Sequence, residues 1–140
     1  MSEPAAALIV GGTGMLAGAT RVLAARAGCA VLVARRPEAL AAGTGAEAVA
    51  LDWSAPDAAA RIAAIPGGFD LGVIWLHDAA AGLARAFEDR LAPGARVIRV
   101  HGSRSMDPAV RAARDPDPRP GLRRQVVILG WHPDPAAPEG

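Results

Sequence analysis

The side chains best suited to acid–base chemistry in this 140-residue chain are its three histidines. His77 is followed by Asp78, His101 stands two residues before Ser103, and His132 lies near the C-terminus. Imidazole exchanges protons near neutral pH, and a neighbouring carboxylate or hydroxyl can orient the ring or share its proton. We therefore take His101, Ser103 and His77 as candidate catalytic residues and expect His132 to have no chemical role.

Each of these candidates also has a structural interpretation that the sequence leaves open. His101 and Ser103 could be hydrogen-bonded loop residues, and Asp78 could cap the next helix instead of orienting His77. Asp52, His77 and His101 show no metal-ligand spacing, so we expect no metal site. A hydrolase with Ser103 as nucleophile is disfavoured, because the second glycine of a Gly-x-Ser-x-Gly turn is missing.

A second chemical pattern is the run Gly11-Gly12-Thr13-Gly14-Met15-Leu16-Ala17, which follows a short apolar segment and precedes an Ala- and Leu-rich one. In this Gly-x-x-Gly-x-x-Ala spacing, the first glycine permits a tight turn and the second lets a pyrophosphate approach the backbone. Amides at the start of the following helix, together with the helix dipole, hold the phosphates. The residues expected to contact a dinucleotide are Gly11, Thr13, Gly14, Met15 and Leu16. The alternative is a glycine-rich turn that binds nothing.

Two arginines, Arg35 and Arg36, occupy the position where an NAD-selective site usually carries Asp or Glu, about 20 residues after the glycines. Guanidinium groups suit a ribose 2′-phosphate, through charge-assisted hydrogen bonds and stacking on adenine, whereas a carboxylate would repel it. The sequence therefore favours NADP(H) over NAD(H). The alternative is that both arginines are solvated loop residues.

These residues must be positioned by a repeated alternation of strands and helices. Short apolar runs typical of strands buried on both faces fall at residues 6–10, 30–34, 46–51, 69–76, 96–101 and 125–131. Helical patterns fall at residues 15–27, 38–42, 55–64 and 79–91, with at most a short helix at 108–114. We predict an α/β fold, a three-layer Rossmann-type sandwich whose parallel sheet has about six strands in the order 3-2-1-4-5-6.

A single domain, residues 1–131, accounts for the whole alternation, and the Pro-rich tail 132–140 is expected to be disordered. In such a fold the carboxyl ends of the strands share one edge, where ligands bind. His77, His101 and the glycine turn should therefore lie along that edge. In so short a domain the edge strands of the sheet are left exposed, and we expect a homodimer to cover them.

The composition limits both partners and mechanism. The net charge is +1 without a long run of either sign, so we expect a small-molecule partner and neither nucleic acid nor a membrane. No signal peptide or transmembrane stretch is visible, which predicts a cytoplasmic protein. The single cysteine, Cys29, is expected to be a buried structural thiol. All 15 basic residues are Arg, and Tyr and Asn are absent, so a mechanism that needs Lys or Tyr is excluded.

From about residue 6 to residue 131 the chain resembles the short-chain dehydrogenase/reductase superfamily, as an atypical and truncated member. The resemblance rests on the glycine turn, on Arg35-Arg36 and on Leu51-Asp52-Trp53. It implies that Asp52 and Trp53 contact the adenine, although Asp52 could instead cap a helix reached through Ser54.

The same resemblance implies a role for residues at two further strand ends. It places His77 beside the cofactor ribose, where the family has an Asn, and it places Ser103 where the family carries a catalytic serine. The family's Tyr-x-x-x-Lys helix cannot exist here, because both residue types are missing.

These features lead to two functional hypotheses. In the first, the chain is an NADP(H)-binding oxidoreductase that passes hydride to a small carbonyl or imine, with His101 and Ser103, assisted by His77, supplying the proton. In the second, it is a non-catalytic NADP(H)-binding sensor or regulatory protein. The strand-end histidines favour the first hypothesis, and the loss of Tyr and Lys favours the second.

Overall fold

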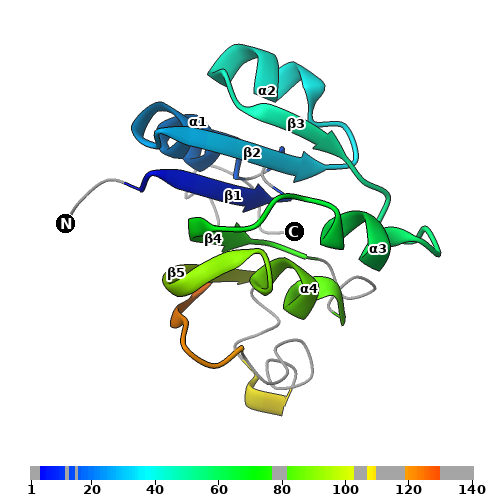
Figure 1. Cartoon of the computed structure of the whole chain (residues 1–140), viewed down its shortest axis with the longest axis vertical. Coiled ribbons are helices and arrows are strands. Elements are labelled where there is room, and N and C mark those ends of the chain that lie inside the picture. The colour runs from blue at the N-terminus through cyan, green and yellow to red at the C-terminus, as the bar shows by residue number, and fades with distance from the viewer. Residues whose placement is uncertain are drawn as a thin grey trace, which may run out of the picture.

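The computed structural model describes residues 4–11, 13–14, 16–76, 82–102, 107–109 and 119–129. Strands and helices alternate along this part of the chain (Figure 1). The elements are β1 (Ala6–Val10), α1 (Ala17–Arg26), β2 (Cys29–Ala34), α2 (Glu38–Thr44), β3 (Glu47–Ala50), α3 (Ala58–Ala63), β4 (Phe69–Ile74), α4 (Ala84–Glu88), β5 (Leu91–Gly102) and β6 (Arg123–Leu129).

The six strands form one sheet in the order β3-β2-β1-β4-β5-β6, and every neighbouring pair is parallel. Parallel neighbours need crossover connections, and α1, α2, α3 and α4 lie in four of the five connections. The strand order reverses between β1 and β4, because the chain first builds the sheet outward from β1 to β3 and then crosses back. The predicted Rossmann-type architecture and strand order are therefore confirmed.

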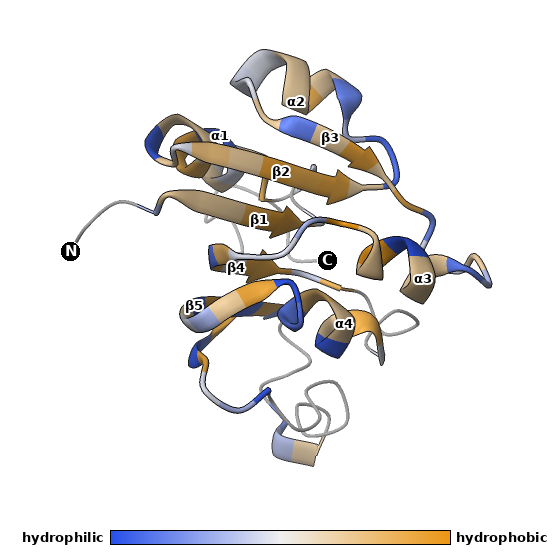
Figure 2. Ribbon diagram, in the orientation of Figure 1, coloured by the Kyte–Doolittle hydropathy of each residue, from blue (hydrophilic) through white to orange (hydrophobic). Residues whose placement is uncertain are grey.

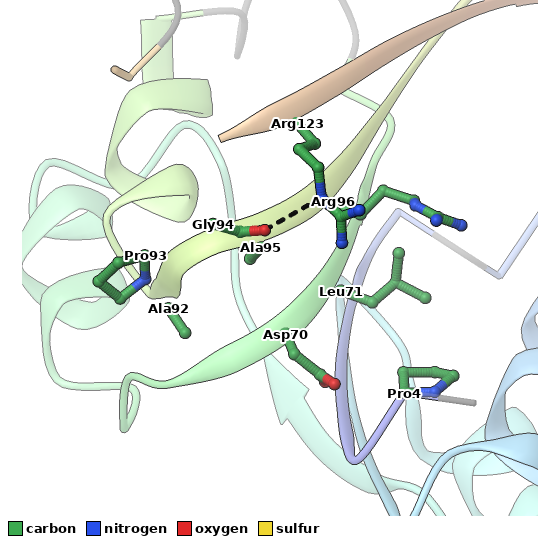
Figure 3. A pocket seen from close by; sticks show the side chains of 9 residues that line it. All are labelled: Pro4, Asp70, Leu71, Ala92, Pro93, Gly94, Ala95, Arg96 and Arg123. Carbon is green, nitrogen blue, oxygen red and sulfur yellow. Dashed lines mark hydrogen bonds between the residues drawn. The ribbon is translucent and has the colours of Figure 1, made fainter. Parts of the chain in front are cut away.

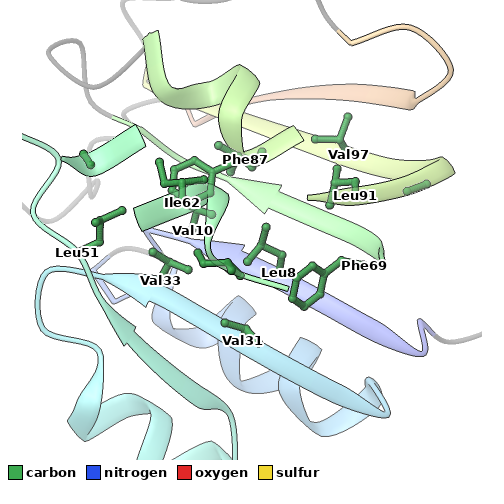
Figure 4. Packing of buried hydrophobic residues seen from close by; sticks show 14 residues of the cluster. Leu8, Val10, Val31, Val33, Leu51, Ile62, Phe69, Phe87, Leu91 and Val97 are labelled. Atoms are coloured by element: carbon green, nitrogen blue, oxygen red, sulfur yellow. The ribbon is translucent and has the colours of Figure 1, made fainter. Parts of the chain in front are cut away.

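Side chains alternate between the two faces of the sheet, and each face has its own core. Leu8 and Val10 of β1 pack with Ile62 of α3 and Phe87 of α4 on one face (Figure 4). Ile9, which points the other way, packs against α1 and α2. The apolar colouring of β1, β2 and β4 in Figure 2 reflects this burial on both faces.

The largest error in the predicted boundaries concerns α4 and β5. The sequence predicted a helix to residue 91 and a strand from residue 96, but α4 ends at Glu88 and β5 already begins at Leu91. Leu91 pairs with Phe69, and the register with β4 then shifts before residue 71. Gly94, with φ +77°, lies within this irregular stretch, so the Pro-Gly pair bends a strand instead of ending a helix.

The prediction of a buried thiol is wrong, because Cys29 is exposed. It is the first residue of β2, and its amide donates to the Ala5 carbonyl at 2.9 Å. Cys29 lines a cavity of about 550 Å³ at the amino ends of β1, β2 and β3, next to the end of α3. The thiol is therefore at an open end of the sheet.

Several predicted features lie outside the described residues. They include the short helix at 108–114, apart from residues 108 and 109, and the tail 132–140. Met15, His77, Ser103 and His132 also lie outside. Among the helices of the described residues, none is long and apolar enough to cross a membrane.

Candidate functional site

The glycine turn lies at the carboxyl end of β1, between β2 and β4. The Gly11 amide donates to the Val33 carbonyl at 2.9 Å, and the Trp75 amide donates to the Val10 carbonyl at 3.0 Å. Gly11 has φ +76°, and a Cβ there would fall on the Trp75 carbonyl oxygen. Only glycine fits this position, which is the topological switch point where open α/β sheets bind ligands.

The backbone around Gly14 leads directly into the start of α1. A Cβ at Gly14 would meet none of the described residues within 4 Å, so they leave the backbone there open to a ligand. Helix α1 begins at Ala17 after Leu16, and no side chain caps its N-terminus. The Ala17 amide already donates to the Gly14 carbonyl at 3.0 Å and the Thr20 amide to the Leu16 carbonyl at 2.8 Å. The N-terminus of α1 also carries the positive end of the helix dipole.

Two other predicted residues of this turn contribute in different ways. Thr13 is exposed, so its hydroxyl is accessible to a ligand. The Leu16 side chain is buried in the core on the α1 face. At Leu16, only the backbone is therefore accessible to a ligand.

Arg35 and Arg36 are exposed and follow directly after β2. The Leu51 amide donates to the Ala34 carbonyl at 2.9 Å and so joins the carboxyl ends of β2 and β3. The pKa of the Asp52 carboxyl is lowered, mainly by hydrogen bonds from the Ser54 hydroxyl and then the Ser54 amide, which outweigh the opposite effect of desolvation. The pairing of the strand ends also brings Asp52 near Arg35, whose charge makes a smaller contribution in the same direction.

The geometry of Asp52 differs from the predicted helix cap. Its Oδ1 accepts from the Ser54 amide at 2.9 Å and from the Ser54 hydroxyl at 2.7 Å. Helix α3 starts only at Ala58, with Asp57 in the N-cap position. Asp52 therefore stabilises the turn after β3 and does not cap the helix, so the capping interpretation is wrong.

Trp53 has a structural role in this turn. Its half-buried ring meets Phe87 edge-on, with ring centroids 5.9 Å apart and an interplanar angle of 78°. The ring also packs against the core cluster on the α3 and α4 face. The indole thus anchors the Asp52 turn to the core, near Arg35.

His101 lies one residue before the carboxyl end of β5, as predicted for a strand-end histidine. It is only 4% exposed, and by strand alternation it shares a face with Arg99 and Val97. Val97 belongs to the core on the α4 side, so the imidazole points to that side of the sheet. Among the described residues, no group of three or more His, Cys, Asp or Glu side chains is arranged to hold a metal ion.

The sequence did not lead us to expect a buried ion pair between Glu88 and Arg99, which lies on the same face of β5 as His101. Arg99 and Glu88 are 2% and 1% exposed, and Arg99 Nη1 lies 3.7 Å from Glu88 Oε2. Arg119 Nη1 donates to the carbonyl oxygens of Glu88 at 2.8 Å and Leu91 at 2.9 Å. An arginine inside the apolar run of β5 was the available signal, since a charge at a buried strand position needs a partner.

Comparison with known proteins finds similarity in structure and none in sequence. No family model and no curated protein sequence matches the chain. BdcA from E. coli has a TM-score of 0.62 and 22% identity, over 89% of this chain and 81% of that one. A short-chain dehydrogenase/reductase from Burkholderia vietnamiensis has a TM-score of 0.61 and 20% identity, over 95% and 87%.

A third similar structure, AibC, has a TM-score of 0.59 and 18% identity over 91% of this chain, which spans only 36% of AibC. At identities this low, the structural similarity establishes a shared fold and nothing more. The chain therefore has a Rossmann-type α/β fold similar to that of a short-chain dehydrogenase/reductase.

Proposed function

We propose that this chain binds NADP(H) along the carboxyl edge of its sheet and passes hydride to a small carbonyl or imine. The observation that carries the proposal is the turn at the switch point. Gly11 is there by steric necessity, Gly14 leaves the backbone open, and the N-terminus of α1 has no side-chain cap. A pyrophosphate supplies the acceptor oxygens and the negative charge that this arrangement lacks.

The preference for NADP(H) rests on the charges after β2. Arg35 and Arg36 are exposed directly after β2, and in Rossmann-type folds the end of the second strand is where the ribose 2′ position is recognised. Asp52 offsets part of the charge of Arg35, because the two interact. We therefore expect Arg36 to contribute more than Arg35 to recognition of the 2′-phosphate.

We expect replacement of Arg36 by Ala to weaken NADPH binding about tenfold, the loss of one charge-assisted interaction. NADH binding should change little, and Arg35→Ala should have a smaller effect than Arg36→Ala. Isothermal titration calorimetry with both nucleotides measures the four affinities. Arg21→Ala, which removes an exposed charge from α1, is the control for net charge. Equal weakening of NADPH and NADH would contradict recognition of the 2′-phosphate at this position.

In the reductase hypothesis, NADPH supplies the hydride and the chain must supply a proton. The absence of Tyr and Lys leaves histidine as the side chain that titrates in the right range. His101, with Ser103 and with His77 beside the ribose, is our proposed source of the proton. The position of His101 at the carboxyl end of β5 supports this assignment.

A second function, a non-catalytic NADP(H) sensor, is favoured by the burial of the same histidine. At 4% exposure, next to the buried Glu88–Arg99 pair, His101 resembles a residue that supports a strand. A sensor needs the nucleotide site alone, and it would signal through a partner.

A two-stage experiment tests the proposal. NADPH is first titrated while tryptophan fluorescence is recorded, because the Trp75 backbone adjoins Gly11. A panel of small aldehydes, ketones and imines is then scored by loss of nicotinamide absorbance, with His101→Gln compared to the unchanged chain. Absence of binding by either nucleotide would refute the site. Binding without turnover would instead favour the sensor.

A further inference from the structure

The amino edge of the sheet, opposite the glycine turn, carries a smaller and a larger cavity. The smaller one, of about 380 Å³, lies at the amino ends of β4, β5 and β6 (Figure 3). Its charged groups are engaged within the chain. The Asp70 carboxylate accepts two backbone amides at the start of β1, Arg123 Nε donates to the Gly94 carbonyl at 3.2 Å, and Arg96 also has a partner. The larger cavity, of about 550 Å³ at the amino ends of β1, β2 and β3, differs in this respect.

Glu47, the first residue of β3, lines the larger cavity and is its one carboxylate. By strand alternation it shares a face with Val49, which packs against the core on the α3 side. Val31 of β2, its register partner, belongs to the same core cluster. Glu47 is exposed, and among the described residues its carboxylate forms neither an ion pair nor a hydrogen bond. The sheet therefore presents a hydrogen-bond acceptor with a full negative charge beside an apolar surface.

Apolar side chains form most of the remaining lining. Val31, Leu51 and Phe69, which belong to the core cluster on the α3 and α4 face, also line the cavity (Figure 4). Ile65 and Pro66 reach it from the connection between α3 and β4. The volume lies within the range of roughly 300–1,000 Å³ that is usual for small-molecule sites. Because both the sheet and this connection contribute walls, a compact molecule buries more of its surface here than a flat protein surface could.

Arg61 also lines the cavity, but it is held away from Glu47. Its Nη2 donates to the Ala50 carbonyl at 2.8 Å, which places the guanidinium at the carboxyl end of β3. Glu47 lies three residues earlier on the strand, at a distance of about 10 Å. Salt largely screens charges that are this far apart. Arg61 therefore neither neutralises Glu47 nor strongly repels a cation bound beside it.

We propose that this cavity is a second ligand site, which binds a small apolar molecule through an ammonium group placed beside Glu47. The ammonium supplies the N–H donors and the positive charge that the carboxylate lacks. The apolar body supplies most of the affinity, because an ion pair near solvent contributes little. A carboxylate ligand would be repelled by Glu47. The proposal does not rest on the proposed function, since Glu47 and the apolar wall do not belong to the nucleotide site.

2-Phenylethylamine is a suitable probe, with 2-phenylethanol as its neutral isostere and 3-phenylpropanoate as the anionic counterpart. In NMR titrations we expect saturable shifts of the Val31, Glu47 and Phe69 amide resonances, with an affinity near the millimolar range typical of so small a ligand. The alcohol should bind about three- to fivefold more weakly than the amine, and the carboxylate more weakly still. Equal binding of amine and alcohol would overturn the ammonium assignment.

Glu47→Gln should weaken the amine to the affinity of the alcohol and leave the alcohol unchanged. Glu38→Gln is the matched control, because Glu38 is an exposed carboxylate on α2 that does not line the cavity. This variant should bind both probes like the unchanged chain. If Glu47→Gln left the preference for the amine intact, the inward charge would serve only to protect the edge strand β3 from pairing, and the proposal would fall.

Cys29, the single cysteine, lines the same cavity and reports where the probe binds. Saturating 2-phenylethanol, which has no charge to change the reactivity of the thiol, should slow the alkylation of Cys29 by iodoacetamide. An unchanged rate would place the probe elsewhere and refute the site. A rate that falls with protein concentration in the absence of a probe would show that a second copy covers the cavity, which also overturns the proposal. Saturating NADPH should leave the amine affinity unchanged, and competition would place the amine in the nucleotide site.

Discussion

Gly11 and Gly14 belong to one motif, but their backbones meet different surroundings. Gly11 has a positive φ and faces the Trp75 carbonyl, so its requirement for glycine arises from folding. Gly14 has open space around its missing Cβ, so any requirement for glycine there arises from a ligand. The two positions therefore separate the structural role of the motif from its binding role.

We expect Gly11→Ala to destabilise the fold by roughly 2–4 kcal/mol, because strain at positive φ adds to the clash with Trp75. Gly14→Ala should change stability by less than about 1 kcal/mol yet weaken NADPH binding, since the new methyl group occupies the ligand's space. Urea unfolding and calorimetric titration measure the two effects. If the Gly14→Ala variant bound NADPH with unchanged affinity, the pyrophosphate would not lie over this residue.

The Glu88–Arg99 pair makes a second prediction at the residue scale. Glu88→Gln removes a carboxylate that faces the buried guanidinium of Arg99, which should cost about 3–5 kcal/mol of unfolding free energy. Arg99→Met combined with Glu88→Gln should cost less than the sum of the two single changes, because the two side chains interact with each other. Asp89→Asn, at the exposed pair with Arg85, should cost at most about 1 kcal/mol and serves as the control. Additive single effects in urea unfolding would contradict the coupling.

At the scale of elements, Asp70 connects the start of β1 to β4. Burial raises the pKa of the Asp70 carboxyl, but hydrogen bonds from the amides of Ala6, Ala5 and Asp70 itself lower it by more. The net pKa therefore lies below the ordinary 3.8. A carboxyl with a lowered pKa in the folded state stabilises the fold above its unfolded pKa. That contribution is lost as the pH falls below about 3.8 and through the folded value.

We therefore expect Asp70→Asn to reduce the acid sensitivity of the fold. The difference in unfolding free energy between the two proteins should be constant above about pH 5 and should shrink towards pH 2. Urea unfolding at a series of pH values provides the measurement, and Asp57→Asn, at the exposed start of α3, is a control carboxyl. A difference independent of pH would show that the Asp70 carboxylate does not hold β1.

The crossover elements were the hardest part of the fold to predict. The sequence indicated a helix up to residue 91, because Pro93-Gly94 looks like a helix stop. The pairing of Leu91 with Phe69 converts that stretch into strand, and the register shift absorbs the Pro-Gly bend. Local signals could not show this, since the pairing partner lies 22 residues away in the chain.

At the scale of the whole molecule, β6 is an edge strand. In the part of the chain that the structure describes, β6 pairs with β5 alone, and Val126 is 39% exposed. Unpaired edges with apolar side chains favour pairing with another chain. We propose that two copies associate through this edge.

Sedimentation equilibrium at micromolar concentration should then give a mass near twice 14.2 kDa. Val126→Lys should shift the mass towards the monomer, because a lysine on an edge strand opposes edge-to-edge pairing. The same substitution at the opposite edge, Ala48→Lys in β3, should leave the dimer intact. A monomer in the unchanged chain would contradict the homodimer.

The sequence by itself determined the architecture of this protein and the position of its glycine turn. A parallel sheet buried on both faces requires short continuous apolar runs, and these runs are visible locally, as are the glycines that separate them from helices. Strand ends could therefore be located, and with them Arg35, Arg36 and His101.

Only the tertiary structure decided which side chains are buried and which become neighbours. It exposed Cys29 at the start of β2, and it packed the half-buried Trp53 ring against the core. It also brought Arg96 beside Arg123, 27 positions further along the chain. Such contacts depend on the register between strands joined by long crossovers, and no local pattern of residue types specifies that register.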